Sequence, residues 1–253
     1  MLDSNTFTQY QAPDSLLKDR IIVVTGAGDG IGKCAALTFA QYGATVVLLG
    51  RTQAKLEAVY DEIEAAGFPQ AAIFPINFEG AIEQDYQQLK TALQDEFGRI
   101  DGILNNAGQL GPLTPLSNYD STSWQRILQV NVTAPFMLTR ALLPLLQKSS
   151  DGRIVFTGST VGIKGRAYWG AYSVSKAAIE NLMQVLADEL DETAIRVNSI
   201  NPGATRTSMR AAAYPAEEPI NISPPTAIMN RYLFLMGRDS IGVHGEQLDA
   251  QPK

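Results

Sequence analysis

The sequence predicts an α/β fold of three layers, with helices on both faces of a doubly wound, mainly parallel sheet. Short β-branched apolar runs alternate along the chain with longer segments of helical period, and this alternation is typical of parallel sheets. The chain has 253 residues, 45% of them hydrophobic, and shows no internal repeat or low-complexity linker. A single domain spanning residues 1–253 is therefore expected.

Six short apolar runs predict strands, and five longer segments predict the helices between them. The expected strands lie at 21–25, 45–49, 71–76, 103–105, 153–157 and 195–200. The expected helices lie at 30–42, at 53–66, in a polar stretch ending at Phe97, at 121–147 and at 172–190. The helix at 121–147 should bend near Pro135 or end its first part there, because proline removes a backbone donor.

Two segments are expected to be irregular. Residues 1–18 predict a polar N-terminal tail, and residues 206–225 predict a long loop that contains Pro215, Pro219, Pro224 and Pro225. Long loops inside compact domains are uncommon and often functional. We expect 206–225 to form a substrate lid, with Met209, Arg210 and Tyr214 as candidates for substrate contact. Trp169, which precedes Tyr172, is a further candidate, and an interface or core aromatic is the alternative for it.

Charge and cysteine content narrow the class of protein. The net charge of −6 and the absence of like-charge blocks do not favour binding to nucleic acid or to an anionic membrane. The single cysteine, Cys34, cannot form an internal disulfide, and the sequence shows neither a signal peptide nor a membrane-spanning run. We therefore expect a cytoplasmic protein. His244 is the only histidine and has no ligand cluster around it, so no metal site is expected.

A glycine-rich turn joins the first expected strand to the first expected helix, in Thr25-Gly26-Ala27-Gly28-Asp29-Gly30-Ile31-Gly32. Glycines permit a tight turn and let backbone N–H groups approach a pyrophosphate at the helix N-terminus. The spacing G-x-G-x-x-G would require glycine at Ile31, so the turn follows T-G-x-x-x-G-x-G instead. A glycine-rich connection in another kind of α/β protein is the alternative.

The end of the second expected strand should meet the adenosine ribose of a dinucleotide bound at this turn. An acidic residue there favours NAD, whereas a cation favours the 2′-phosphate of NADP. The chain has Leu49-Gly50-Arg51-Thr52 and no acid at this point. Arg51 therefore favours NADP(H), although NAD(H) is not excluded and a solvated arginine at a helix start is the alternative.

Ser159, Tyr172 and Lys176 are candidate catalytic residues. Ser159 follows the fifth expected strand, and Tyr172 precedes Lys176 by four positions, which places both on one face of a helix. A nearby ammonium favours the phenolate of a tyrosine and brings its pKa closer to neutral pH, as general acid–base catalysis requires. Ser159 would donate to a carbonyl oxygen that gains negative charge. Taken singly, such a Tyr/Lys pair is more often surface decoration, and such a serine is more often a cap.

Together and in this order, these residues resemble the short-chain dehydrogenase/reductase family, and the resemblance runs from about Asp19 to Ala250. It implies a Rossmann-type sheet of seven strands. It also implies that Tyr172 is the acid/base, that Lys176 lowers its pKa and holds the nicotinamide ribose, and that Ser159 orients the substrate. Asn131 matches the family's asparagine that holds a water linked to the lysine, so it would complete a proton relay.

The same resemblance implies where the dinucleotide binds. Asn77-Phe78 stands where the family usually has an aspartate against the adenine, and the asparagine amide still supplies a donor and an acceptor there. Asn105–Gly108 and Asn201–Thr207 resemble the family's segments at the adenosine side and at the nicotinamide. The expected cofactor-binding residues are Gly26, Asp29, Gly30, Ile31, Arg51, Asn77, Phe78, Asn105, Ala107, Gly108, Tyr172, Lys176, Pro202, Gly203 and Thr205.

The function that these features predict is an NADP-dependent oxidoreductase that interconverts a carbonyl and an alcohol of a small molecule. The alternative is a non-catalytic NAD(P)-binding interaction module, because the fold alone does not fix the function. A dehydratase or epimerase usually carries a further C-terminal substrate domain, for which the chain has no room. The family resemblance also implies a homodimer or homotetramer formed through the helices at 121–147 and 172–190. Stretches at 16–22, 184–189 and 249–252 resemble a narrower bacterial group that brings no settled substrate.

Overall fold

The computed structural model describes residue 7 and residues 9–251. Within this part of the chain, seven strands form one sheet in the order β3-β2-β1-β4-β5-β6-β7, and every neighbouring pair is parallel. The strands are β1 (Ile21–Thr25), β2 (Thr45–Gly50), β3 (Ala72–Pro75), β4 (Gly102–Asn105), β5 (Gly152–Thr157), β6 (Ile195–Asn201) and β7 (Gln247–Asp249). The predicted fold class and the seven-stranded sheet are confirmed.

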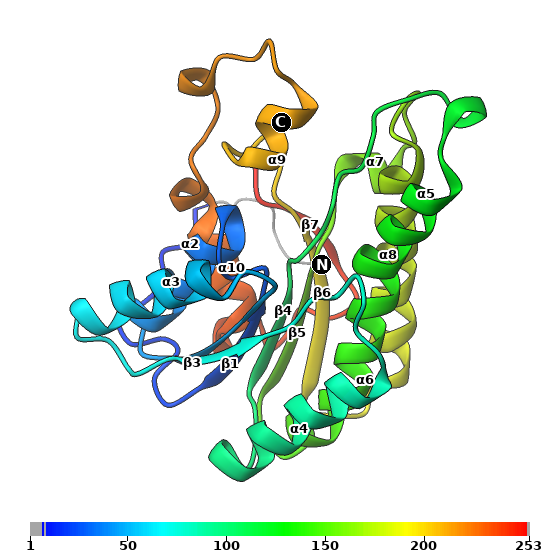
Figure 1. Ribbon diagram of the computed structural model, residues 1–253. Helices are drawn as coiled ribbons and strands as arrows, with labels where there is room; N and C mark the ends of the chain where they lie inside the picture. The colour runs from blue at the N-terminus through cyan, green and yellow to red at the C-terminus, as the bar shows by residue number, and fades with distance from the viewer. Residues whose placement is uncertain (1–6, 8, 252–253) are drawn as a thin grey trace.

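Helices cover both faces of the sheet, as Figure 1 shows: α2, α3 and α10 lie on one side, and α4, α6 and α8 lie on the other. The long helices are α2 (Gly30–Gln41), α3 (Gln53–Ala65), α4 (Glu83–Phe97), α5 (Ser121–Leu128), α6 (Ala134–Leu146), α8 (Gly170–Glu189) and α10 (Met229–Met236). Two short helices are α7 (Thr160–Ile163) and α9 (Ser208–Ala213), and 3₁₀ turns lie at Leu116–Asn118, Pro219–Asn221, Pro225–Ile228 and Arg238–Ser240.

Each face of the sheet packs into its own apolar core, because successive side chains of a strand point to opposite faces. Ile22 and Val24 of β1 belong to the core beneath α2, α3 and α10. Ile21 and Val23 of the same strand belong to the core beneath α4, α6 and α8. This two-sided burial explains why the strands are continuous apolar runs rather than alternating ones.

The chain reverses its direction across the sheet between β1 and β4. These strands are neighbours in the sheet, although β2 and β3 separate them in sequence and lie outward on the other side of β1. Ligands of open α/β sheets bind beside such a switch point, outside the carboxyl ends of the strands. The topology therefore places the candidate site next to the ends of β1 and β4.

The long helix predicted at 121–147 is interrupted just before Pro135. The chain leaves α winding at Leu128, makes a π-helical turn over Gln129–Thr133, and resumes as α6 at Ala134. Pro135 stands in the first turn of α6, directly after the π-helical turn, and it cannot donate a backbone hydrogen bond to the carbonyls of that turn. Pro144 lies inside α6.

The described part of the N-terminal segment is packed against the protein, so the prediction of a polar tail over 1–18 is wrong there. Phe7 and Leu17 are buried, and the rings of Phe7 and Tyr10 meet Phe234 of α10 edge-on, with centroids 5.6 and 5.0 Å apart. Apolar side chains dispersed among polar ones produced the error. Residues 1–6 and 8 lie outside the described residues.

The segment predicted as a lid is not a plain loop, because it contains α9 and a 3₁₀ turn. Thr207 caps α9 by accepting from the Arg210 N–H at 3.1 Å. Thr205 and Ser223 form a β-bridge, and the Arg206 N–H donates to the Ser223 carbonyl at 2.9 Å. The two ends of the segment are therefore joined at its base.

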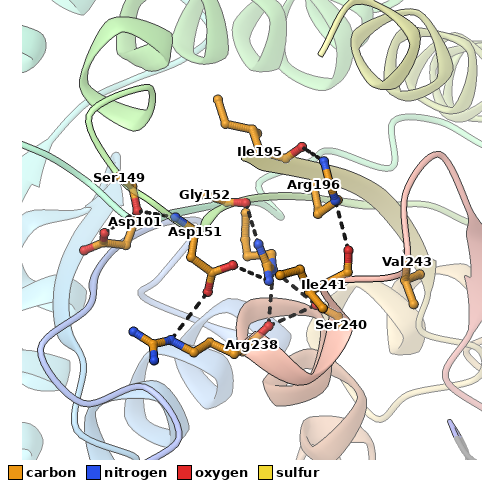
Figure 2. Close-up of polar contacts among 12 residues, drawn as sticks. Asp101, Ser149, Asp151, Gly152, Ile195, Arg196, Arg238, Ser240, Ile241 and Val243 are labelled. Atoms are coloured by element: carbon orange, nitrogen blue, oxygen red, sulfur yellow. Dashed lines mark hydrogen bonds and ion pairs between the residues drawn. The ribbon is translucent and has the colours of Figure 1, made fainter. Parts of the chain in front are cut away.

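Buried charges link the amino ends of the strands. Arg153 of β5 is fully buried, and its Nη2 lies 2.5 Å from Asp151 Oδ1. It also donates to the Gly237 carbonyl and to Ser240 Oγ, each at 3.2 Å. Figure 2 shows Ser149 linking Asp101 to the Asp151 backbone: its Oγ donates to Asp101 Oδ1 and accepts from the Asp151 N–H. The exposed Arg238 also contacts Asp151, with its Nε 3.9 Å from Oδ2. Burial lowers the pKa of Arg153 to about 10, and Asp151 opposes this shift.

Arg153 and Arg238 provide a matched test of this cluster, because both contact Asp151 but only Arg153 is buried. We expect Arg153→Ala to lower the free energy of unfolding by roughly 3–5 kcal/mol, since it breaks a buried ion pair. Arg238→Ala, at an 81% exposed side chain, should lower it by less than about 0.5 kcal/mol. Urea unfolding followed by circular dichroism measures both values. Equal effects of the two substitutions on the free energy of unfolding would contradict the conclusion that the buried Arg153 stabilises this cluster.

Candidate active site

A cavity of about 440 Å³ opens at the carboxyl ends of the strands, beside the neighbouring ends of β1 and β4. Nearly all residues predicted for catalysis or cofactor binding line it. They are Gly26, Asp29, Gly30, Ile31, Arg51, Asn77, Phe78, Ala107, Gly108, Ser159, Tyr172, Lys176, Pro202, Gly203 and Thr205. Trp169, Met209, Arg210 and Tyr214, named from the sequence as candidates for substrate contact, line it as well. The fold therefore brings segments from six strand ends to one place.

Asn105 is the predicted cofactor-binding residue that does not line the cavity. Its side chain is buried at the end of β4, and its Nδ2 donates to Thr139 Oγ1 of α6 at 3.2 Å. It therefore attaches the strand to the helix behind it. Asn105 and Asn106 are adjacent in the sequence, and it is Asn106 that lines the cavity, because successive residues at a strand end point in opposite directions.

The glycine turn after β1 needs its glycines because neighbouring backbone lies very close. Gly26 has a φ of 68°, and a Cβ there would lie 3.1 Å from Ala107 Cα. A Cβ on Gly32 would lie 2.2 Å from the Gly26 carbonyl oxygen. Thr25 Oγ1 accepts from the N–H groups of Asn106 and Ala107, both at 2.9 Å. The turn and the end of β4 are thus held together, with the N-terminus of α2 at the cavity.

Charged side chains gather where β2 ends. Asp29 caps α2 by accepting from the Gly30 N–H at 2.7 Å, and its other oxygen lies 2.8 Å from Lys55 Nζ. The hydrogen bond from Lys55 lowers the pKa of Asp29 below its ordinary value. Arg51 is exposed on the same wall of the cavity. This end of the cavity therefore presents cations suited to a phosphate group.

Ser159, Tyr172 and Lys176 meet on the cavity floor. Ser159 stands just after β5, before α7, and hydrogen-bonds with the Tyr172 hydroxyl. Tyr172 and Lys176 lie one turn apart on α8, and both are buried. Lys176 Nζ donates to the Thr157 carbonyl at 2.7 Å and lies 5.6 Å from the centroid of the Tyr172 ring. The i, i+4 spacing seen in the sequence thus places Tyr172 and Lys176 side by side next to Ser159.

Burial dominates the ionisation of both side chains. It raises the pKa of Tyr172, and the Ser159 hydrogen bond opposes the shift. It lowers the pKa of Lys176 to about 8, and the charge of Glu180 opposes that shift. In the protein alone Tyr172 therefore carries its proton, and the sequence-based expectation of a lowered tyrosine pKa does not describe this state.

Asn131 lies behind the cavity wall, in the π-helical turn. Its Oδ1 accepts from the Gln109 N–H at 2.8 Å, and its Nδ2 donates to the Gln109 carbonyl at 2.9 Å and to Ser175 Oγ at 3.0 Å. It therefore connects the segment after β4 to the helix that carries Tyr172 and Lys176. Such single π turns inside α-helices frequently occur at functional sites.

Glu180 is a buried carboxyl group that the sequence analysis missed. It lies one turn after Lys176 on α8 and accepts a hydrogen bond from Ser199 of β6. A Cβ on Gly158 would lie 2.0 Å from Glu180 Oε1, so the carboxylate sits directly against the segment before Ser159. Burial raises the pKa of Glu180, whereas Ser199, Gln247 and Lys176 lower it. The sequence does offer a signal for Glu180, because its i, i+4 spacing from Lys176 places both side chains on one face of α8.

Gln251 is a second missed residue, and no local pattern points to it. Its side-chain Nε2 lies 2.8 Å from the Pro202 carbonyl, 2.9 Å from the Ala204 carbonyl and 3.3 Å from Thr205 Oγ1. Asp249 of β7 also accepts from Asn201 Nδ2 at 2.6 Å. The segment predicted to meet the nicotinamide is therefore shaped by residues about 50 positions later in the chain.

His244 has a structural role between β6 and α8. Its Nδ1 accepts from the Val197 N–H of β6 at 3.1 Å, and its Nε2 lies 2.7 Å from the Ala187 carbonyl of α8. Both ring nitrogens are therefore used in joining the strand to the helix.

Comparison with known proteins assigns the family. A model of the short chain dehydrogenase family matches residues 20–218. The chain belongs to this family. It is 51% identical to Uncharacterized oxidoreductase YciK of Escherichia coli (strain K12) over 243 residues, which are 96% of each chain. This similarity confirms the narrower bacterial group expected from the sequence, and the protein is an oxidoreductase of the short chain dehydrogenase family.

Solved structures of similar proteins have the same fold. A putative short chain dehydrogenase from Pseudomonas syringae is 55% identical, with a TM-score of 0.94 over 99% of this chain and 100% of that one. A putative short chain dehydrogenase from Shigella flexneri 2a, complexed with NADP, is 51% identical, with a TM-score of 0.93 over 95% of this chain and 100% of that one.

The buried lysine makes stability depend on pH in a defined direction. Because the pKa of Lys176 in the folded chain is about 8, against an ordinary 10.5, the unfolded chain binds more protons between these values. Stability attributable to this group therefore rises with pH through this window. Relative to Lys176→Met, the wild type should gain about 3 kcal/mol of unfolding free energy across the window. Urea unfolding of both proteins over the same pH series measures the gain, and a constant difference would contradict it.

Proposed function

We propose that this protein is an NADP-dependent oxidoreductase that interconverts a carbonyl and an alcohol, with Tyr172 as the acid/base. The observation that carries the proposal is the hydrogen-bonded Tyr172–Ser159 pair beside Lys176, on the floor of a cavity that also receives the glycine turn. Any one of these residues has a structural explanation. Their convergence on one cavity favours catalysis over a module that only binds a nucleotide.

The residues present fit a dinucleotide. The turn at Gly26 and Gly32 leaves no room for side chains, and the N-terminus of α2 beside it is suited to a pyrophosphate. Arg51 would hold the 2′-phosphate of NADP, and the similar protein from Shigella flexneri 2a is complexed with NADP. Pro202, Gly203 and Thr205 would face the nicotinamide end. When bound, the nicotinamide supplies the hydride.

The protein's own groups handle the proton. In the reducing direction, Tyr172 Oη donates its proton to the carbonyl oxygen while the carbonyl carbon accepts the hydride, and the product is an alcohol. Ser159 Oγ donates a hydrogen bond to the same oxygen and stabilises the charge that develops on it. The Lys176 ammonium stabilises the phenolate that remains on Tyr172. Asn131 keeps the wall segment at Gln109 in place behind Lys176.

The assembly and the location of the protein stay predictions. Val174 and Val185 of α8 are each 46% exposed, and Phe136 of α6 is 42% exposed. The two valines are three helical turns apart and so share one face of α8. These apolar side chains support the proposed homodimer or homotetramer. No helix among the described residues is long and apolar enough to cross a membrane.

Tyr172→Phe tests the acid/base role. The substitution removes the hydroxyl but keeps the ring, so turnover of an accepted carbonyl should fall by roughly 10²–10⁴-fold. NADPH binding, followed by fluorescence titration, should stay within twofold or so of the wild-type value, because the cavity keeps its shape. Tyr168→Phe, at an exposed tyrosine, is the control and should leave turnover unchanged. Full activity of Tyr172→Phe would overturn the acid/base assignment, whereas the absence of turnover by the wild type with every carbonyl tested would support the binding-module alternative.

Arg51→Ala tests the choice of cofactor. Loss of a charge-assisted bond to the 2′-phosphate should raise the Kd for NADPH by roughly 10- to 100-fold. The Kd for NADH, which lacks this phosphate, should change little. Arg99→Ala, at the opposite end of the sheet, is the matched control. An equal change for NADPH and NADH, or no change for either, would overturn the 2′-phosphate assignment.

A further inference from the structure

Aromatic rings form a row from the catalytic tyrosine to the lid. The ring of Trp169, just before α8, lies with its centroid 5.8 Å from that of Tyr172 and 5.8 Å from that of Tyr214. Tyr214 ends α9 in the lid segment. All three rings line the cavity, and the apolar side chains of Leu110, Met209 and Ala213 line it too. The space next to the Tyr172 hydroxyl is therefore bounded mainly by aromatic and apolar groups.

The one cation that the lid presents to this space is already neutralised. Among the described residues that line the cavity, Arg210 is the charged side chain of the lid segment. Its Nε and Nη2 each lie 2.6 Å from a different oxygen of Glu217, which does not line the cavity. Its guanidinium also lies 3.8 Å from the centroid of the Tyr214 ring. Glu217 thus engages one edge of the Arg210 guanidinium and balances its charge, so the cation that a carboxylate would meet beside the lid is already paired.

We propose that the substrate is a neutral carbonyl compound carrying an aromatic ring, and that this ring binds against Trp169 while Glu217 occupies Arg210 and so excludes carboxylated substrates. This proposal rests on the proposed carbonyl/alcohol function of the same site. A planar ring gains from offset or edge contacts with Trp169 that a saturated ring of similar size does not make. A carboxylate would have to displace Glu217 or approach an arginine whose charge Glu217 already balances. It would therefore gain little charge-assisted pairing to offset its dehydration.

The ring preference is tested with phenylacetone and cyclohexylacetone, whose carbonyls are equally unconjugated. With NADPH present, the wild type should favour phenylacetone by roughly two- to tenfold, in Kd by calorimetry and in kcat/KM. Trp169→Leu should abolish the preference, and Trp169→Phe should retain most of it. Trp124→Leu is the matched control, because Trp124 packs on Tyr119 and does not line the cavity. Equal values for the two ketones in the wild type would overturn the aromatic assignment.

The charge selectivity is tested with 4-(2-oxopropyl)benzoate and its methyl ester. The wild type should prefer the ester. Glu217→Gln frees Arg210 and should shift the acid-to-ester ratio toward the acid by roughly tenfold or more, because a charge-assisted pair becomes available. Glu218→Gln, at the exposed neighbouring glutamate, should leave the ratio unchanged. Equal wild-type values for acid and ester, or an unchanged ratio in Glu217→Gln, would overturn the role of Glu217.

Binding and turnover separate this inference from the function on which it rests. Turnover without a preference for the aromatic, uncharged ketone would overturn the proposed substrate class and would still support the oxidoreductase function. A clear Kd preference without Tyr172-dependent turnover supports the binding site and sinks the catalytic proposal. The absence of both preference and turnover overturns both.

Discussion

The Lys176 ammonium group lies inside the protein, where it donates to the Thr157 carbonyl at 2.7 Å. A buried charge needs partners, since its dehydration is otherwise very unfavourable. The carbonyl belongs to the last residue of β5, so this one bond fixes the register of α8 against the strand that precedes Ser159. Glu180 supplies an opposite charge one turn further along α8 and is held by Ser199 of β6. The position of Tyr172 follows from this arrangement, because it shares the helix face of Lys176.

A second set of contacts joins α8 and β7 to the segments after β4 and β6, which line the end of the cavity where we propose that the cofactor binds. Asn131 joins α8 to the segment after β4 through Ser175 and Gln109, and Asn201 reaches both Thr160 of α7 and Asp249 of β7 at 3.0 and 2.6 Å. Gln251 then holds the carbonyls of Pro202 and Ala204. Each contact joins residues that are distant in sequence. The site is therefore rigid only when the entire sheet is formed.

This dependence explains which features could be predicted from sequence. The strands, the glycine turn and the Tyr172–Lys176 spacing follow from local periodicity and backbone geometry, and they appeared where expected. Asn105 and Asn106 could not be told apart, since the direction of a side chain at a strand end depends on the exact register. The π turn around Asn131 and the clamp by Gln251 have no local signal at all. The packed segment near Phe7 was missed because its apolar residues are few, and their burial against Phe234 is a tertiary event.

The lid segment is held mainly by contacts among its own residues, whereas the part of the cavity around Lys176 is held by contacts between segments distant in sequence. Arg210 and Glu217 pair across seven residues, and the bridge between Thr205 and Ser223 closes the segment at its base. Its contacts with the rest of the molecule include the ring contact of Tyr214 with Trp169 and a hydrogen bond from Arg166 to the Tyr214 hydroxyl at 3.0 Å. Because local contacts hold the lid, substitutions there change what lies beside Tyr172 without disturbing the buried Lys176 beneath it. The lid and the segments around Lys176 are thus stabilised by separate sets of contacts, so the proposed substrate specificity and the proposed proton transfer would reside in different parts of the chain.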